Sequence, residues 1–211
     1  MPFCGILYED ASLLLCVKEA GLDSEKALPA RLSEQTGGEI YCVHRLDRDA
    51  AGLMVYAKSR KAAAALSAAV SQGQFHKEYL AVVQGETEDR GQLRDLLYHD
   101  AARNKTYVVK RMRRGVREAL LNYETLERRE GLSLARIQLL TGRSHQIRVQ
   151  FSSRKQPLVG DRKYGSAYRD CPLALWSAEL SFPHPETGET LTFSAVPDQT
   201  LWPWSLFPEK L

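Results

Sequence analysis

The sequence predicts an α+β fold in which a mixed, mostly antiparallel central sheet is flanked by helices. The chain of 211 residues has 44% hydrophobic and 26% charged residues, which is ordinary globular usage and disfavours disorder, collagen and coiled coils. Strand-like apolar runs dominate its second half. Helical segments do not alternate regularly with strands, which disfavours a doubly wound parallel sheet. No clear boundary separates two domains, so one domain over residues 1–211 is expected.

In the first half, helix signals stand between short apolar runs. A helix is expected to begin near Pro29, a residue suited to a first helical turn, and to end at Gly37. A second helix is expected over 59–72, with Ser59 as its cap, many alanines inside and Gly73 as its stop. The expected strands are 6–8, 12–17, 40–43 and 52–57.

The second half reads mainly as strands. Gly131 lies between two apolar runs and predicts a hairpin. A helix is expected over 144–153, because Gly142 turns the chain after a strand and Ile147 and Phe151 share one helical face. The expected strands are 79–83, 106–109, 119–126, 132–140, 173–182 and 190–196, the last pair joined by a turn at 185–188.

The cysteines and the hydropathy indicate a cytoplasmic protein, which is expected to be monomeric. Neither a CxxC pair nor a zinc-finger spacing is present, so free thiols in a reducing cytosol are expected. The first ten residues have no basic region and meet acid at Glu9, unlike a signal peptide. The longest stretch without a charge or histidine, 62–75, has 14 residues, fewer than the ~20 that span a bilayer. The cysteines are Cys4, Cys16, Cys42 and Cys171.

Positive charge is concentrated in one segment of the chain. The net charge is only +3, from 29 basic and 26 acidic residues. Residues 101–117 carry seven Lys or Arg and no acid, which leaves 22 basic and 26 acidic residues elsewhere. This basic stripe indicates an anionic partner and suggests nucleic-acid contact, although a solvated loop is the alternative. Its members are Arg103, Lys105, Lys110, Arg111, Arg113, Arg114 and Arg117.

Polar residues are dense at 44–49, His-Arg-Leu-Asp-Arg-Asp, between two apolar strand candidates. Charge between buried strands costs free energy unless it is paired or used. Asp47, with Arg45 and Arg48 nearby, is expected to stay ionised, which suits a nucleophile or an electrostatic stabiliser. A charged surface loop with local ion pairs is the alternative.

Two further segments suit a site. Tyr79, in a strand candidate, is either a core residue or a site residue. Arg143 and His145 flank the start of the helix after Gly142, where free N–H groups favour anions, and His145 and Arg148 are spaced i,i+3 on one helical face. A phosphate or carboxylate site and simple helix capping both remain open there.

Taken together and in order, these segments resemble the RluA-type family of RNA pseudouridine synthases. The resemblance covers nearly the whole chain, because the opening segments 7–10 and 18–21 also fit. The matching motifs are HRLDR at 44–48, KEYLAVVQG at 77–85, TGRSHQIR at 141–148, PLVGD at 157–161 and Tyr164-Gly165.

The resemblance implies a pseudouridine synthase fold and an enzyme that isomerises one uridine of a structured ribosomal or transfer RNA, without cofactor or metal. It implies Asp47 as the catalytic carboxylate, Tyr79 packed against the target base, and Arg148 paired with Asp47. The target base must be flipped out of its stack, and Arg45 is expected to fill or brace the vacated place. No accessory RNA-binding domain is expected before the catalytic one. Further RNA contacts are expected from Lys77, Arg143, His145 and the basic stripe.

Three departures from the family pattern matter. Ala50-Ala51 stands where the family usually has Thr-Ser, so two hydroxyls that could brace the loop are missing. Glu19 stands where a proline is frequent, and Gln150 stands where a histidine is common. A catalytically weak RNA-binding protein that keeps the fold is therefore the alternative.

Two other enzyme classes are disfavoured. A hydrolase would use Asp47 with a second carboxylate such as Asp49 as acid and base, but Arg45 and Arg48 beside them argue against a protonated acid. A metal-dependent nuclease needs a cluster of carboxylate or histidine ligands, and the sequence suggests none.

Overall fold

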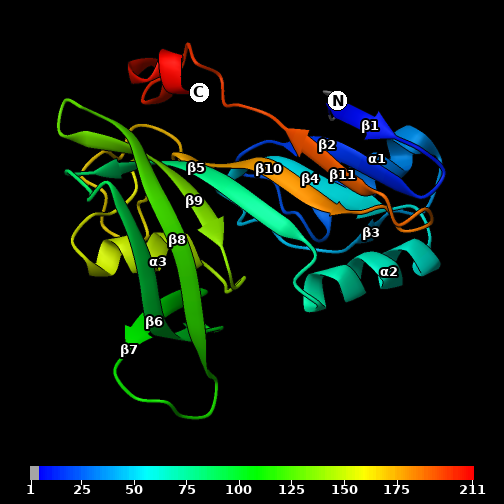
Figure 1. Cartoon of the computed structure of the whole chain (residues 1–211), viewed down its shortest axis with the longest axis horizontal. Helices are drawn as coiled ribbons and strands as arrows, with labels where there is room; N and C mark the ends of the chain where they lie inside the picture. Colours follow the sequence, from blue (N-terminus) through cyan, green and yellow to red (C-terminus); the bar gives the residue numbers. More distant parts are fainter. Residues whose placement is uncertain (1–4) are drawn as a thin grey trace. The chain divides into compact units, whose positions relative to one another are not determined.

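The computed structural model describes residues 5–211 and divides the chain into two compact units (Figure 1). Unit 1 comprises residues up to 77 together with 176–196, and unit 2 comprises 78–175 together with 197–211. Neither unit is one continuous segment, because the chain leaves unit 1 and later returns to it. This interleaving explains why no change in composition marks a boundary, and the single domain stays a prediction.

Unit 1 is a mostly antiparallel sheet with two helices. Its strands run in the order β1-β2-β4-β10-β11, and β3 also pairs with β4. The β4–β10 pair is parallel, while the other pairs are antiparallel. The elements are β1 (Ile6–Glu9), β2 (Leu13–Lys18), α1 (Ala27–Thr36), β3 (Tyr41–Cys42), β4 (Ala51–Ala57), α2 (Arg60–Ser71), β10 (Leu175–Pro183) and β11 (Thr190–Ser194).

The helices of unit 1 end where their sequence signals indicate. Gly37 closes α1 in the left-handed conformation, with φ 73°, and its N–H donates to the carbonyl of Ser33. The Ser59 side chain caps α2 by accepting from the N–H of Ala62. α2 packs against β3 and β4. The buried core of this unit comprises Leu13, Leu15, Leu53, Val55, Ala57, Ala62, Leu66, Phe75, Leu180 and Phe182.

Unit 2 is an antiparallel sheet with one regular helix, in the strand order β5-β9-β8-β6-β7. The helix, α3 (Gln146–Ser153), packs against β6 and β7. Two short 3₁₀ helices follow near the C-terminus, Trp204–Leu206 and Pro208–Lys210. The strands are β5 (His76–Gln84), β6 (Arg90–Asp100), β7 (Lys105–Val109), β8 (Val116–Arg129) and β9 (Leu132–Leu139).

The α+β class and the mostly antiparallel strand pairing are confirmed, and so is the hairpin at Gly131 between β8 and β9. The sequence analysis missed β6, because its charged residues hide the alternation that buries Leu93 and Leu97. It also placed the start of the third helix at Ser144, whereas α3 begins at Gln146. The tertiary pairing with β7 and β8 stabilises β6 despite its polar sequence.

Cys42 and Cys171 are free thiols as predicted, Cys16 is buried in β2, and Cys4 lies outside the described residues. Within residues 5–211, no helix is long and apolar enough to cross a membrane. No group of three or more His, Cys, Asp or Glu side chains in this part of the chain could hold a metal ion.

Candidate active site

The loop that carries Asp47 connects β3 to β4 in unit 1, and a buried lysine anchors it. Lys18, at the end of β2, is 0% exposed. Its ammonium donates to the carbonyl oxygens of Glu19 (2.9 Å), Leu22 (3.0 Å) and Arg48 (3.0 Å). The three bonds satisfy all donors of the ammonium and fix the loop directly beside Asp47.

The charge of Lys18 also acts on the acids of this loop. Burial lowers the pKa of Lys18 to about 8, while the charges of Asp47 and Asp49 favour its protonated form. The buried ammonium is therefore coupled electrostatically to the acids of this loop. The sequence analysis considered only Arg45 and Arg48 as the cations near Asp47 and did not include Lys18.

Further bonds brace the loop where Ala50-Ala51 offers no hydroxyl. The Ser24 hydroxyl donates to the carbonyl of Leu46 (2.9 Å) and accepts from its N–H (3.2 Å). Arg48 donates from Nε to the carbonyl of Gly21 (2.8 Å), and the Gly21 N–H donates to the carbonyl of Arg48 (2.7 Å). The segment 18–24 therefore supplies bracing that does not depend on the missing hydroxyls.

His44 is a buried, neutral part of this support. Its Nε2 accepts from the N–H of Val55 (3.2 Å), and its ring lies 5.1 Å from the Phe75 ring. Burial holds the pKa of His44 well below its usual range, and the charge of Lys77 acts in the same direction. His44 therefore orients the start of the loop and does not exchange protons near neutral pH.

Two predicted RNA-contact residues of unit 1 differ in exposure. Arg45 is exposed and forms a surface ion pair with Glu25 at 3.3 Å. Lys77, at the start of β5, is half-buried, and its ammonium lies 5.1 Å from the Phe75 ring centroid. Burial lowers the pKa of Lys77 to about 8. Arg45 can reach a large ligand easily, whereas Lys77 offers a partly desolvated donor.

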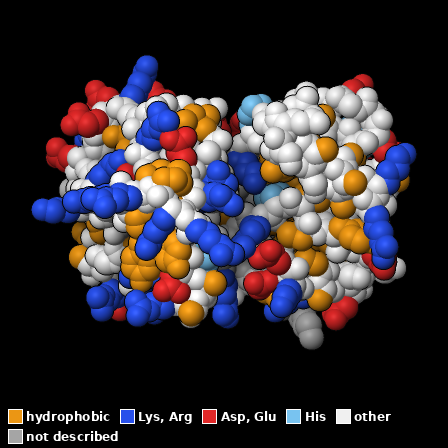
Figure 2. Space-filling model, turned by 90° about the horizontal axis from the view of Figure 1, so that it is seen from below, with side chains coloured by type: hydrophobic (Ala, Val, Ile, Leu, Met, Phe, Trp, Pro, Cys, Tyr) orange, Lys and Arg blue, Asp and Glu red, His pale blue; other side chains and the backbone are white. Residues whose placement is uncertain are grey.

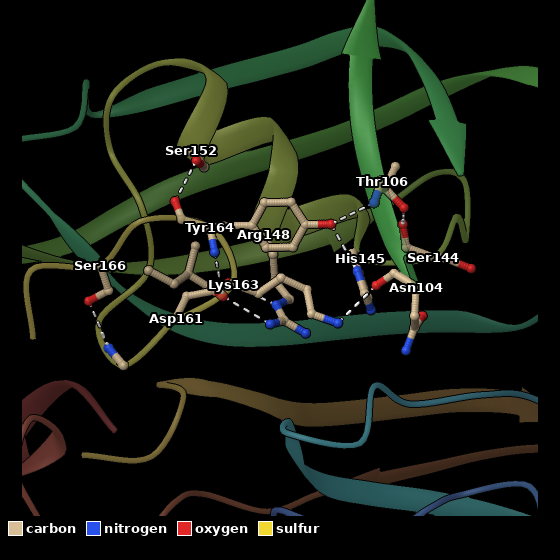
Figure 3. A network of polar contacts seen from close by, with 12 residues as sticks. Asn104, Thr106, Ser144, His145, Arg148, Ser152, Asp161, Lys163, Tyr164 and Ser166 are labelled. Carbon is tan, nitrogen blue, oxygen red and sulfur yellow. Dashed lines mark hydrogen bonds and ion pairs between the residues drawn. The ribbon is translucent and has the colours of Figure 1, made fainter. Parts of the chain in front are cut away.

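The other predicted catalytic residues, Tyr79 and Arg148, belong to unit 2. Tyr79 lies on β5 opposite Ile137 of β9 and is 5% exposed. Arg148 lies on α3 and forms a paired salt bridge with Asp161, with Nε–Oδ2 at 2.7 Å and Nη2–Oδ1 at 2.9 Å (Figure 3). The side chains of this pair are 3% and 0% exposed. Such a pair fixes both the position and the plane of the guanidinium.

Tyr164 extends this network, as Figure 3 shows. Its hydroxyl accepts from the N–H of Thr106 (2.8 Å) and is bonded to Nδ1 of His145 (2.8 Å). Its ring lies 5.3 Å from the Arg148 guanidinium and 5.4 Å from the Lys105 ammonium. Burial raises the pKa of Tyr164, so its hydroxyl stays protonated. The network joins α3, β7 and the segment that follows α3.

Side-chain hydrogen bonds hold the segment that leads into α3. His145 adopts the left-handed conformation, with φ 54°, and is 8% exposed. The Gln146 side chain accepts from the N–H of Arg143 (3.0 Å) and from the Thr141 hydroxyl (2.9 Å). Arg143 is exposed, and its Nε donates to the carbonyl of Glu118 (3.0 Å). His145 at the N-cap makes no side-chain capping bond, and the Gln146 bonds hold the segment before the helix instead. RNA contacts by Arg143 and His145 stay predictions.

The basic stripe lies in unit 2 on turns and strand ends, as expected for a segment that links strands. Its arginines and Lys110 are exposed, while Lys105 is half-buried between the Tyr107 and Tyr164 rings. Arg113 lies 5.1 Å from the Tyr98 ring. Figure 2 shows Lys and Arg side chains over the face of unit 2 that is visible there. The combination of cations with aromatic rings suits RNA.

Two residues that support the site were missed by the sequence analysis. Lys18 and Asp161 stand in quoted motifs, but neither was assigned a role. A charged residue inside an apolar strand or between buried residues is a signal of a buried pair, and it could have identified both. Their partners, three carbonyls and Arg148, come together only in the fold.

Comparisons with known proteins identify relatives of this chain. The chain is similar to ribosomal large subunit pseudouridine synthase D of Pseudomonas aeruginosa, with 32% identity over 95% of this chain and 71% of that protein. It is also similar to tRNA pseudouridine synthase C of Haemophilus ducreyi, with 30% identity over 92% of this chain and 91% of that protein. A third relative is ribosomal large subunit pseudouridine synthase D of Neisseria meningitidis, with 33% identity over 92% of this chain and 58% of that protein.

A solved structure shows the same fold. Human RNA Pseudouridylate Synthase Domain Containing 1 superposes with a TM-score of 0.80 at 23% identity, covering 94% of this chain and 84% of that chain. Residues 12–153 match the RNA pseudouridylate synthase family. Since that match covers well over half of the sequence, the chain belongs to the RNA pseudouridylate synthase family, in its RluA-type branch, and is an isomerase.

Proposed function

We propose that this enzyme converts one uridine of a ribosomal or transfer RNA stem-loop to pseudouridine, with Asp47 as the catalytic carboxylate and with neither cofactor nor metal. The observation that carries the proposal is the position of Asp47 in a loop that Lys18 and Ser24 brace from within. Relatives named for ribosomal RNA and for transfer RNA are both similar to this chain, which supports either substrate.

The reaction exchanges one bond for another without a net change in composition. The C1′–N1 glycosidic bond breaks, the uracil turns, and C5 forms a bond to C1′. The proton on C5 then leaves, and N1 carries a proton in the product. Asp47 either attacks C1′ or removes the C2′ proton, and an ionised carboxylate suits both routes. Nothing in this sequence of bonds needs a metal or an electron carrier.

Arg148 and Tyr79 complete the proposed machinery. In this proposal Arg148 is the partner of Asp47, which it would orient toward the reacting sugar. The ion pair with Asp161 supports this role, because it fixes the guanidinium at one position. Tyr79 offers a flat face to the loosened uracil and a hydroxyl for proton transfer at C5.

Exposed cations provide the proposed grip on RNA. Flipping the target nucleotide costs a few kcal/mol, and Arg45 is proposed to fill the vacated place. The exposed position of Arg45 supports this. Moving its side chain into RNA breaks a surface ion pair with Glu25, and such pairs contribute little free energy. The basic stripe holds the phosphate backbone of an RNA loop whose bases are splayed out.

The test is a pseudouridine map of total RNA incubated with purified enzyme. We expect at least one new pseudouridine with wild type and none with Asp47→Asn, while the neighbouring Asp49→Asn variant keeps the site. A new site that persists with Asp47→Asn contradicts the catalytic assignment. Retained RNA binding without any new site would favour the alternative of an RNA-binding protein.

A further inference from the structure

An exposed pair of aromatic rings lies in unit 2. Tyr168 and Trp202 are each 39% exposed, and their ring centroids are 5.1 Å apart at an interplanar angle of 53°. Leu201 beside them is 58% exposed. Large apolar side chains that are exposed together often mark an interaction surface. None of these residues belongs to the proposed catalytic machinery.

Backbone and side-chain bonds hold Tyr168 in place. The Ser166 hydroxyl accepts from the N–H of Tyr168 (3.1 Å) and donates to its carbonyl (3.0 Å). Gln84 on β5 accepts from the N–H of Ala167 (3.1 Å). The Ser166 N–H donates to the carbonyl of Asp161 (3.0 Å), the residue that holds Arg148. The ring is therefore presented by an ordered loop that is continuous with the candidate site.

Cations stand near Tyr168 in the chain, and one of them connects this loop to the basic stripe. Arg162 and Arg169 are exposed, and Nε of Arg162 donates to the carbonyl of Arg169 (2.8 Å). The Lys163 ammonium donates to the carbonyl of Asn104, inside the stripe segment, at 2.8 Å. Thus positive charge continues from the stripe along the loop toward Tyr168.

Acids also occur near these cations in the chain, and Asp161 among them is paired with Arg148. Asp170 follows Arg169 in the chain, and the Asp198 carboxylate is occupied by the N–H and hydroxyl of Thr200 at 2.9 and 2.7 Å. A flat apolar surface next to guanidinium groups fits a partner with planar rings and negative charge. Unpaired nucleotides of RNA have both, since their bases can stack on aromatic rings.

We infer that Tyr168 and Trp202 form a stacking surface for an unpaired nucleotide of the substrate RNA, with Arg162 and Arg169 at its phosphates. This inference rests on the proposed function, because it assumes an RNA substrate. Bases inside a duplex are already stacked, so the surface selects loops and single-stranded flanks.

The experiment measures affinity and kinetics for the RNA stem-loop that wild type modifies. Tyr168→Ala and Trp202→Ala are each expected to weaken binding about tenfold, the scale of one lost base stack. KM is expected to rise while kcat stays near wild type, because these rings bind a nucleotide that does not react. Tyr168→Phe keeps the ring and is expected to keep the affinity. The control is Leu7→Ala, which removes an exposed side chain (54%) in unit 1.

Tryptophan emission gives a second measurement. RNA is expected to quench part of the emission of wild type, and Trp202→Phe removes that part while it keeps the affinity. Unchanged affinity and KM in folded alanine variants overturn the inference. So does a loss of self-association in Trp202→Ala, measured by sedimentation, with unchanged RNA binding, because the surface would then bind a second copy.

A further binding experiment distinguishes a failure of the stacking surface from a failure of the proposed reaction. An oligouridine probe measures binding whether or not any uridine is modified. Weaker oligouridine binding by the alanine variants, together with no modification by wild type, would support the stacking surface and contradict the proposed reaction. Equal oligouridine binding by all variants would contradict the surface itself.

Discussion

Lys18 and Arg148 are the cations that the fold buries most completely within residues 5–211, at 0% and 2% exposure. The free energy lost by removing each charge from water is offset by different partners. Lys18 is surrounded by three backbone carbonyls, while Arg148 meets the carboxylate of Asp161. Each arrangement is exacting, because removing a partner leaves a charge or a dipole unsatisfied. Lys18 braces the loop that carries Asp47, and Arg148 is itself proposed for catalysis.

Lys18 is expected to make the stability of the enzyme rise in mild alkali. Its pKa is lowered in the folded state to about 8 from 10.5, so the unfolded chain binds more protons between these values. The penalty for burying the charge is present below pH 8 and is relieved as the pH rises toward 10.5. Relative to Lys18→Met, wild type is expected to gain on the order of 3 kcal/mol over this range. Urea denaturation at several pH values measures the difference.

The control for Lys18 is Lys61→Met, because Lys61 is exposed on α2. Its pH dependence is expected to match that of wild type. If Lys18→Met also followed the wild-type curve between pH 8 and 10.5, the buried ammonium would not be the titrating group.

Asp161→Asn is expected to lower the free energy of unfolding by about 3 kcal/mol, because it breaks a fully buried ion pair while the Arg148 charge remains. The matched control is Glu118→Gln, which breaks the exposed 2.7 Å pair with Arg94. That change is expected to cost less than about 1 kcal/mol. Urea denaturation at pH 7 compares them, and equal losses would contradict the distinction between the pairs.

At the scale of elements, close packing of backbones decides where strands can pair. Gly52 on β4 stands opposite Lys18 of β2 and Ser177 of β10, at the parallel pair of unit 1. Its φ is 113°, in the region that favours glycine. A Cβ at this position would lie 2.4 Å from the carbonyl oxygen of Ser177.

Gly52→Ala is therefore expected to destabilise the protein by more than about 2 kcal/mol, since backbone clash and strain act together. Gly38→Ala serves as the control, because a Cβ there meets nothing within 4 Å. Thermal unfolding followed by circular dichroism measures both. Equal melting temperatures for the two variants would contradict this prediction, because they would mean that β4 and β10 make room for the Cβ without a loss of stability.

At the scale of the whole molecule, the uneven charge distribution predicts how RNA binding depends on salt. Reversing Arg113 and Arg114 to Glu is expected to lower the slope of log Kd against log salt by about 1 to 2, because each released counterion contributes about 0.7 to 0.9. Arg60→Glu with Lys61→Glu is the control, since it changes the net charge equally in unit 1. An unchanged slope in the stripe variant would make the stripe a solvated loop.

The secondary structure was largely predictable because its signals are local. Ser59 and Gly37 define helix ends through their own backbone preferences, and Gly131 defines a hairpin in the same way. β6 was not predictable, because its stability comes from pairing with β7 and β8. The start of α3 was misplaced by two residues, since His145 takes a left-handed conformation and bonds to Tyr164, which lies 19 positions away.

The sequence by itself determined the family, the α+β class and the candidate residues, because short motifs and local backbone preferences carry that information. Only the tertiary structure decided what supports those residues. Lys18 meets the carbonyl of Arg48 across 30 positions, and Arg148 meets Asp161 across 13. Contacts between residues distant in the sequence depend on how strands and helices pack, and the free energy of a buried charge depends on those contacts.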